Sequence, residues 1–297
     1  MTTLTEIKPK FDVYQMATDR IINLIETSQT LVWRKTWKDS NLQRTEFAKN
    51  LTTMQEYNGI NRLLLNLAGF EIPYFITFNQ CRDLGGNVKK GAKSLPVFFF
   101  SHGEKMNEQG ENEKFGFWKY YNVFNVQDCE GLKYPTPEII APGEETQTII
   151  KNGKIGICES IVENYKDCPA IVSKTQSRCY YSVNEDFVSM PDLEIFNDSE
   201  SYYATLFHEL AHSTGNEKRL NRDMKNGFGS DKYAKEELIA EFTASFLCDY
   251  TGINNAPLDE NCAAYLQNWV KRFKEDKKLL LSSASMAQRA ADYILSK

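Results

Sequence analysis

The sequence has only three histidines among its 297 residues, and none of its seven cysteines forms a CxxC pair. Without such pairs a zinc knuckle is not indicated, and an odd number of cysteines does not make a complete disulfide framework. We therefore interpret the cysteines as buried thiols of a protein that resides in a reducing cytoplasm.

Long hydrophobic runs are also lacking. No apolar run approaches the roughly 18–20 residues that a membrane span requires, and the N-terminal stretch MTTLTEIKPKFDVYQ has no continuous apolar region typical of a signal peptide. We expect a soluble, cytoplasmic protein that makes no contact with a membrane.

Charge is present in ordinary amount but is unevenly placed. Residues 1–100 carry 13 Lys and Arg against 9 Asp and Glu, whereas the remainder carries 22 against 31. A basic N-terminal half beside an acidic C-terminal half indicates that any polyanion contacts the first. An acidic DNA mimic ranks last among the functions considered, because the acidic surplus is spread over nearly two thirds of the chain.

Helical and strand patterns alternate along the chain, which predicts an α+β fold in two domains. A cluster of proline and glycine, including Pro135, Pro142 and Gly143, predicts a linker at 133–148. The domains are then 1–132, of mixed α and β character, and 149–297, which is mostly helical. Within the first domain, the polar segment 102–114 is interpreted as a hairpin-like excursion that forms an exposed loop between two strands.

His208, Glu209 and His212 form an HExxH motif in the segment SYYATLFHELAHSTG. Apolar spacing, polar capping residues before the segment and Gly215 after it predict a helix. Positions i and i+4 of a helix lie on one face about 6 Å apart, so that both imidazoles can bind one zinc ion. The alternative, two incidental histidines on a helix, requires two of three histidines to fall by chance around a glutamate.

A catalytic zinc needs a third protein ligand and an open position. No histidine follows His212, so we expect a carboxylate from the next helix, SDKYAKEELIAEFTASFLCDYTG. Glu237 is assigned as the ligand, Glu241 as the residue that holds an imidazole N–H, and Glu236 as a solvated residue. An exchange of roles between Glu237 and Glu241 stays open, as does a solvated acidic face.

The expected chemistry is amide hydrolysis. Glu209 stands beside the metal ligands and would act as the general base toward an attacking water. Tyr233 precedes Glu237 by one turn and could donate to a developing oxyanion, although a packing role fits it equally well. Mn²⁺ or Co²⁺ could occupy the site in place of Zn²⁺.

Three groups in the N-terminal half combine aromatic rings, amides and cations, as in single-stranded nucleic-acid binding. Each group also fits core tryptophans or solvated lysines, so the residues alone leave both interpretations open. The candidate DNA-binding residues are Trp33, Arg34, Lys35, Trp37, Tyr57, Asn58, Asn61, Lys89, Lys90 and Lys93.

Long motifs in both halves resemble those of one protein family. The N-terminal half contains WRKTW, YNGINRLLLNLAGFEIPYF and WKYYNVFNVQDCEGL, and the C-terminal half contains YYATLFHELAHSTG, RLNR and YAKEELIAEFTASFLC. These resemble ArdC-type antirestriction proteins, whose N-terminal domain is related to the N-terminal part of plasmid TraC primases.

The resemblance implies a single-stranded DNA-binding domain joined to a gluzincin-like metallopeptidase domain. It also implies a role on conjugative plasmids, shielding incoming DNA from host restriction, with possible transfer to the recipient cell. His208, Glu209 and His212 match the family's HExxH, and Glu237 and Glu241 match its EELxAE. A host restriction component or another protein is the peptide substrate that this role implies.

Two other functions stay open. The chain could be a cytoplasmic zinc protease whose N-terminal domain recognises a protein substrate. It could also be a DNA-coating protein in which the metal is structural. Salt-dependent DNA affinity separates the first from the antirestriction role, because phosphate contacts release counterions.

Overall fold

The computed structural model describes residues 12–33, 43–44, 47–106, 112–136, 139–140, 153–173, 178–224, 230–253 and 263–297. Its helices are α1 (Val13–Ser28), α2 (Ile60–Asn66), α3 (Phe78–Asp83), α4 (Gly156–Asn164), α5 (Ser199–Ser213), α6 (Asp231–Thr251), α7 (Ala263–Glu275) and α8 (Leu279–Ile294). Its strands are β1 (Gln43–Arg44), β2 (Lys49–Asn50), β3 (Tyr74–Thr77), β4 (Asn87–Val88), β5 (Leu95–Met106), β6 (Asn112–Asn125), β7 (Cys129–Glu130), β8 (Ile139–Ile140), β9 (Ala170–Ser173), β10 (Tyr180–Ser182) and β11 (Phe187–Met190).

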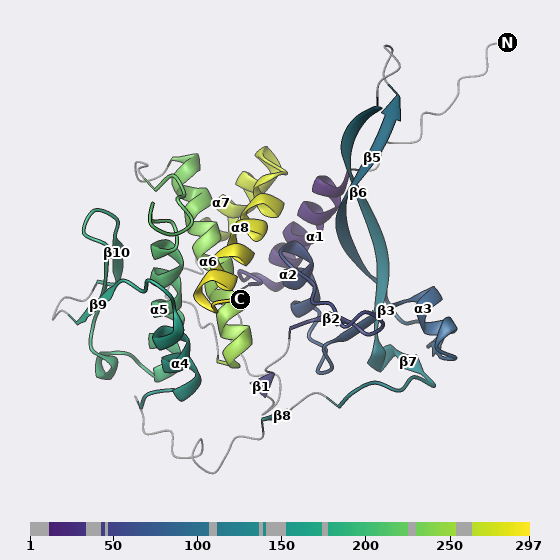
Figure 1. Cartoon of the computed structure of the whole chain (residues 1–297), viewed down its shortest axis with the longest axis horizontal. Coiled ribbons are helices and arrows are strands. Elements are labelled where there is room, and N and C mark those ends of the chain that lie inside the picture. The colour runs from purple at the N-terminus through teal and green to yellow at the C-terminus, as the bar shows by residue number, and fades with distance from the viewer. Residues whose placement is uncertain are drawn as a thin grey trace.

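The N-terminal half is built on a sheet with the strand order β2-β3-β6-β5, whereas the C-terminal half is mostly helical (Figure 1). β5 and β6 pair antiparallel from Leu95 opposite Val123 to Met106 opposite Asn112. They form a long two-stranded ribbon that rises beyond the body of the molecule (Figure 1). The α+β class expected from the sequence is confirmed.

The prediction of an exposed loop over 102–114 is wrong. Strands continue through Met106 and resume at Asn112, and only 107–111 lie outside the described residues. The reason is that cross-strand backbone hydrogen bonds hold a ribbon together even where its side chains are polar. Polar composition alone therefore does not distinguish a projecting ribbon from a loop.

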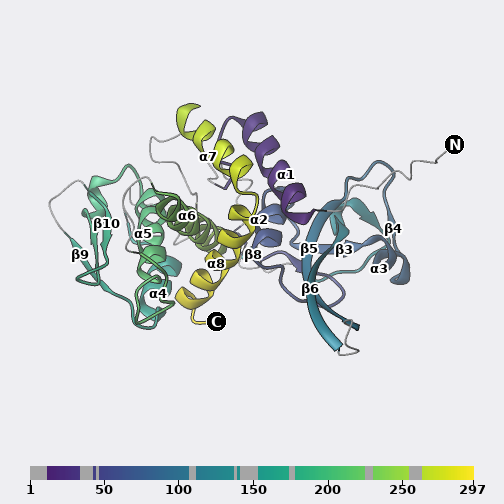
Figure 2. The same cartoon turned by 90° about the horizontal axis from the view of Figure 1, so that it is seen from above.

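One hydrophobic core joins the two halves. Helix α1 packs on α7 and α8, and α2 packs on α8, so that buried residues of the first half, such as Ile21 and Leu63, share a cluster with Phe242 and Leu280. Figure 2 shows α1 and α2 between the C-terminal helices and the ribbon. The two halves are therefore continuous in space, although their sequences have different characters.

Trp33, predicted to bind DNA, belongs to this core. Only 1% of its surface is exposed, and its ring contacts Phe242 at 5.0 Å, Phe273 at 6.2 Å and Trp269 at 6.3 Å between centroids. A ring enclosed by two helices cannot stack on a base, so the DNA-binding prediction for Trp33 is wrong. Large aromatic rings stabilise cores more often than they remain open.

The C-terminal end of α6 is attached to the N-terminal half. Arg62 is buried with its guanidinium 3.4 Å from the centre of the Phe47 ring and 5.6 Å from that of Phe246 on α6. Asn66 Nδ2 donates to Asp249 Oδ2 at 2.7 Å. Burial lowers the pKa of Arg62 to about 10, against the charge of Glu56, which raises it. Helix α6 is thereby attached to the N-terminal half near its C-terminal end.

A second sheet, with the order β10-β11-β9, lies beside α5. β10 pairs antiparallel with β11, and β9 pairs parallel with it. Over the residues that the structure describes, no helix combines the length and the apolarity that crossing a membrane requires.

Candidate metal centre

The two HExxH histidines lie on one face of α5. The helix begins after Asp198, whose side chain accepts a hydrogen bond from the Ser201 backbone N–H at 2.7 Å, as expected of an N-cap. The Nε2 atoms of His208 and His212 are 3.1 Å apart. The i and i+4 spacing therefore brings the two imidazoles together as the sequence predicts.

Helix α6 brings Glu237 to the same point. It begins after the N-cap Ser230 and packs against α5. One Glu237 carboxylate oxygen lies 3.5 Å from His208 Nε2 and the other 3.7 Å from His212 Nε2. These residues form the one group among the described residues whose ligand atoms, all within 4.8 Å of one another, suit a metal ion.

The donor set fits a divalent ion. A tetrahedral ion with bonds of about 2.0–2.1 Å to nitrogen and oxygen sets its ligand atoms about 3.3 Å apart, close to the separations given above. The side chains of His208, His212 and Glu237 are 23%, 12% and 27% exposed. The group is therefore open on one side, as a catalytic metal site requires.

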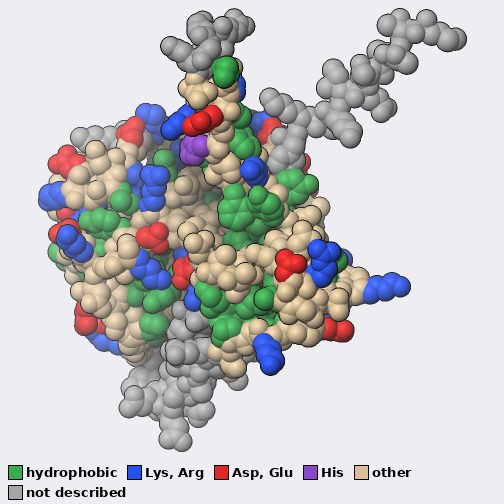
Figure 3. Space-filling model, turned by 45° about the vertical axis from the view of Figure 1, so that its right-hand side comes forward, with side chains coloured by type: hydrophobic (Ala, Val, Ile, Leu, Met, Phe, Trp, Pro, Cys, Tyr) green, Lys and Arg blue, Asp and Glu red, His purple; other side chains and the backbone are tan. Residues whose placement is uncertain are grey.

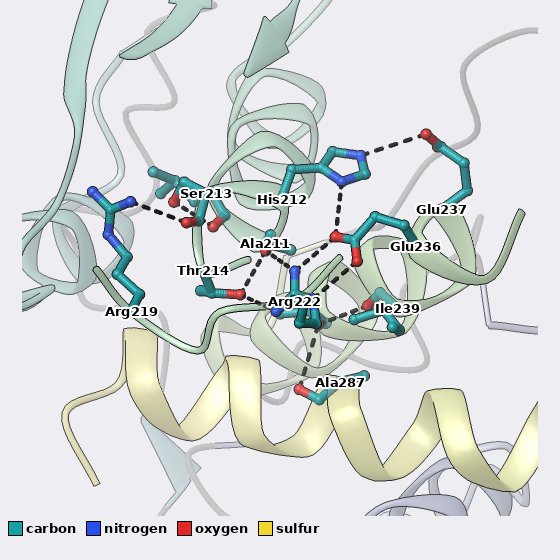
Figure 4. Close-up of polar contacts among 12 residues, drawn as sticks. Ala211, His212, Ser213, Thr214, Arg219, Arg222, Glu236, Glu237, Ile239 and Ala287 are labelled. Carbon is teal, nitrogen blue, oxygen red and sulfur yellow. Dashed lines mark hydrogen bonds and ion pairs between the residues drawn. The ribbon is translucent and has the colours of Figure 1, made fainter. Parts of the chain in front are cut away.

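Glu236, expected to be solvated, is buried and holds His212. Its Oε1 lies 3.3 Å from His212 Nδ1, and its two oxygens accept hydrogen bonds from Arg222 Nη2 at 2.7 Å and Nε at 2.9 Å (Figure 4). The prediction for Glu236 is wrong. A carboxylate on Nδ1 favours the tautomer whose Nε2 lone pair is free to bind metal.

Glu241 was expected to hold an imidazole N–H, and at His212 that contact is made by Glu236 instead. Glu241 is itself buried at 4% exposure. Because each helical residue advances by about 100° around the axis, Glu236 points to a different side of α6 from Glu237. On that side it meets both His212 and the loop that carries Arg222.

Arg222 was missed as a site residue because it lies in the loop that follows α5. Arg222 Nη2 donates to the Ala211 carbonyl at 2.9 Å, and Nη1 donates to Thr214 Oγ1 at 2.7 Å (Figure 4). Arg219, three residues earlier, pairs with Asp186 at 2.8 Å. The RLNR motif spans both arginines and was the available signal, but its contacts depend on how the loop folds back.

The charges at the centre raise the pKa of His212 and lower the pKa of Glu237. Burial would lower the pKa of His212, but the contact with Glu236 and the charges of Glu237 and Glu209 outweigh burial and raise it to about 9. Burial would raise the pKa of Glu237, but His208, His212 and a hydrogen bond from Tyr233 bring it to about 2. Without metal, His212 therefore holds an additional proton near neutral pH.

Glu209 and Tyr233 flank this group. Glu209 is buried, and its charge acts on His212 and on Cys179, the residue before β10. Its carboxylate therefore lies within electrostatic reach of both His212 and Cys179. The Tyr233 hydroxyl lies within hydrogen-bonding reach of Glu237, so its contact in this structure is with a ligand carboxylate.

Two further DNA-binding candidates are structural. Tyr57 is 5% exposed, and its ring packs on Phe75. Asn61 is buried, where its amide donates to the Phe98 carbonyl at 2.7 Å and accepts from the Phe98 N–H at 2.7 Å. Those DNA-binding predictions are wrong, because Asn61 fixes α2 to β5 and the Tyr57 ring packs against β3.

The remaining candidates are exposed or lie outside the described residues. Lys89, Lys90 and Lys93 are exposed in the turn between β4 and β5, where Lys89 Nζ donates to the Gln127 carbonyl at 2.8 Å. Asn58 is exposed and accepts from Arg62 at 3.4 Å. Arg34, Lys35 and Trp37 lie outside the described residues.

Comparison with known proteins relates both halves to one kind of protein. The model of the N-terminal domain of the anti-restriction factor ArdC matches residues 11–124, and that of a zincin-like metallopeptidase matches residues 159–286. The metal-free crystal structure of the antirestriction protein ArdC from plasmid R388 is 34% identical, with a TM-score of 0.77 over 96% of this chain and 97% of that one. Its Mn(II)-bound structure is 32% identical, with a TM-score of 0.76 over 96% and 98%.

The similarity to curated relatives also extends along nearly the whole chain. Two DNA primases TraC of Escherichia coli are 29% and 28% identical over 98% and 97% of this chain. The chain spans only 28% and 20% of their lengths. An uncharacterized protein y4eC of Sinorhizobium fredii is 27% identical over 99% of this chain and 95% of its own length.

Proposed function

Because this chain belongs to the family of ArdC-type antirestriction proteins, we propose that it binds single-stranded DNA and carries a metal-dependent peptidase centre. In this proposal it acts in the cytoplasm and protects incoming conjugative DNA from host restriction. Its zincin-like domain would act on a host restriction component or another protein. The boundaries 1–132 and 149–297 belong to the same proposal.

The observation that carries the proposal is the convergence of two imidazole nitrogens and one carboxylate beside a second carboxylate. His208, His212 and Glu237 are the residues that would hold the ion. Two nitrogens and one oxygen suit Zn²⁺, and Mn²⁺ or Co²⁺ can bind the same donors. A bound divalent ion would supply Lewis acidity at the open side of the group.

The protein's own residues would perform the remaining steps. The carboxylate of Glu209 would take a proton from the attacking water and pass it to the leaving amine. Glu236 would keep His212 Nδ1 protonated, which leaves Nε2 unprotonated and available as a ligand. Tyr233 would exchange its hydrogen bond with Glu237 for one to the developing oxyanion.

Fluorescence anisotropy with a labelled oligonucleotide tests the DNA-binding part. The same sequence is offered as a single strand and as a duplex, across a salt series, to metal-loaded and metal-free protein. We expect the single strand to bind more tightly, with log K falling by about 0.7 per phosphate contact for each tenfold rise in salt.

The alternatives predict different results. Absence of binding to both oligonucleotides would make the N-terminal half a module that recognises a protein substrate. Tight binding by a protein that retains metal but cleaves no peptide would instead assign the metal a structural role.

A further inference from the structure

The β5–β6 ribbon exposes a row of aromatic side chains on one of its faces. Directly paired residues of antiparallel strands lie on the same face. The pairs Phe99–Lys119, Ser101–Phe117 and Gly103–Phe115 therefore share a face with Tyr121, which is paired with Val97. We call Phe99, Phe115, Phe117, Lys119 and Tyr121 the aromatic stripe.

The rings of the stripe are accessible. Phe99, Phe115 and Tyr121 are 40%, 41% and 49% exposed. Figure 3 shows hydrophobic side chains gathered along the ribbon below its tip. Large side chains left open to water at this density usually mark a contact surface.

Gly103 sets the orientation of two of the rings. A Cβ atom at this position would lie 2.9 Å from the Phe115 ring and 3.2 Å from the Phe117 ring. The rings therefore lie across the glycine, with their planes 30° apart and their centroids 5.5 Å apart. A ring that lies across a sheet presents its face, rather than its edge, to whatever approaches.

Lys119 places a cation within the row of aromatic rings. Lys119 Nζ lies 5.1 Å from the centre of the Phe117 ring, and it stands between Phe117 and Tyr121 on the same face. Alternate residues of a strand are about 7 Å apart, so rings and cation recur at the scale of one extended nucleotide. At the tip end, Lys105 and Glu113 pair at 3.3 Å and bound the stripe.

The opposite face of the ribbon is engaged within the protein at Trp118. There the Trp118 ring packs on Tyr14 of α1 at 5.9 Å between centroids, and its Nε1 donates to the Tyr14 hydroxyl at 3.0 Å. Helix α1 therefore supports the ribbon from one side. Beyond Trp118 that face also exposes rings, Phe100 at 53% and Tyr120 at 41%. The aromatic stripe differs in placing a lysine, Lys119, between its rings.

We propose that the aromatic stripe stacks the bases of a single DNA strand while Lys119 meets its phosphates. Aromatic rings interleaved with cations bind single strands with little sequence preference, because every base has a π face. A duplex keeps its bases stacked on one another and offers no such face. This inference rests on the single-stranded DNA binding proposed above.

The size of the stripe favours a strand over a protein. Two strands about 5 Å apart and six residues long cover roughly 200 Å². A stable protein interface, including one with a second copy of this chain, buries about 800 Å² on each partner. A single nucleic-acid strand needs only a narrow contact surface of this kind.

Neighbouring tyrosines provide a matched test. Tyr121 lies on the stripe, and Tyr120, 41% exposed on the same strand, lies on the opposite face. Binding of a fluorescein-labelled oligothymidylate is measured by anisotropy for the wild type, Tyr121→Ala and Tyr120→Ala. Loss of one stacking ring weakens binding about 5- to 100-fold. We expect that loss for Tyr121→Ala, near-normal affinity for Tyr120→Ala, and recovery with Tyr121→Trp.

Lysines give a second, independent comparison. Lys119→Ala removes an exposed cation from the stripe, and Lys114→Ala removes one from the opposite face. We expect only Lys119→Ala to reduce the salt slope, by about 0.7. Circular dichroism of each variant checks that it remains folded.

Failure of this inference and failure of the proposed function give different results. If the wild type binds no single strand, the proposed function fails and this inference with it. If the wild type binds and Tyr121→Ala and Lys119→Ala bind as the wild type does, the stripe is not the DNA surface, and the function stands. Sedimentation that detects a dimer lost in Tyr121→Ala, with DNA affinity unchanged, would assign the stripe to a second copy of the chain.

Discussion

The candidate metal centre and the ribbon differ in how far each can be recognised from the sequence alone. At the metal centre, three of the four nearest residues lie within five positions on one helix, and their spacing alone brings them together. On the ribbon, the aromatic stripe draws on two strands whose pairing decides which rings share a face. Local spacing therefore identified candidate metal ligands, whereas the proposed binding surface depended on register.

Among the variants that test the difference between the two regions, Glu209→Ala is expected to have the largest effect. Loss of a general base lowers the rate of peptide hydrolysis by about 10²- to 10⁴-fold, because water is no longer deprotonated during attack. Cleavage of labelled casein measures the rate, mass spectrometry measures bound metal, and anisotropy measures DNA affinity. Metal content and DNA affinity should stay at wild-type levels, which would show that the two regions work separately.

Glu217→Ala is the control, since Glu217 is an exposed glutamate just beyond the same helix. Wild-type cleavage by Glu209→Ala would remove Glu209 from the proposed mechanism. Loss of metal from that variant would make Glu209 a ligand instead.

Trp33→Ala should act on stability rather than on DNA binding. Truncation of a fully buried aromatic ring costs about 3–5 kcal/mol of unfolding free energy, because a cavity opens between α6 and α7. Urea unfolding followed by circular dichroism measures the loss, and anisotropy is measured under conditions where the variant is folded. Weakened DNA binding with unchanged stability would return Trp33 to the DNA surface and contradict its place in the core.

Glu236→Gln should weaken metal binding by about 10- to 100-fold, since the neutral amide holds the His212 ring less firmly and leaves Arg222 without its partner charge. Competition with a fluorescent zinc chelator measures the affinity. Glu217→Gln again serves as the control. An unchanged affinity would show that Glu236 only fixes the loop.

The pH dependence of metal binding is expected to have a definite sign. His212 has a pKa raised to about 9 in the metal-free protein, so metal must displace a proton below that pH. Affinity should rise about tenfold per pH unit toward pH 9 and then level off. In Glu236→Gln the plateau should begin at lower pH, and an affinity that is flat from pH 7 to 9 would contradict the proposed protonation.

Stability of the metal-free protein should change in the opposite direction. A group whose folded pKa is raised stabilises the fold fully below its unfolded pKa, about 6.5 for histidine. That contribution is lost as the pH rises through about 9. Thermal unfolding of metal-free protein should therefore occur at lower temperature as the pH increases across this window.

Sequence patterns located the two helices that form the candidate metal centre. The helix expected in SYYATLFHELAHSTG is α5, and the helix expected in SDKYAKEELIAEFTASFLCDYTG is α6. The continuation of the ribbon through its polar residues was not predicted, because backbone pairing satisfies polar strands as well as apolar ones. The division at 133–148 stays a prediction on the sequence, and in space α1 and α2 share a core with α8.

By itself the sequence determined the residues whose relation is local, His208, Glu209 and His212 on one turn of helix. It left the third ligand open between Glu237 and Glu241, and the structure brings Glu237 to the two histidines. Only the tertiary structure decided that Glu236, rather than Glu241, meets His212, because Arg222 returns from a loop to meet it. Only the tertiary structure decided that Trp33, Tyr57 and Asn61 are buried, while Phe99, Phe115 and Tyr121 are open. The physical reason is that helix periodicity fixes neighbours a few residues apart, whereas burial depends on which distant surfaces pack together.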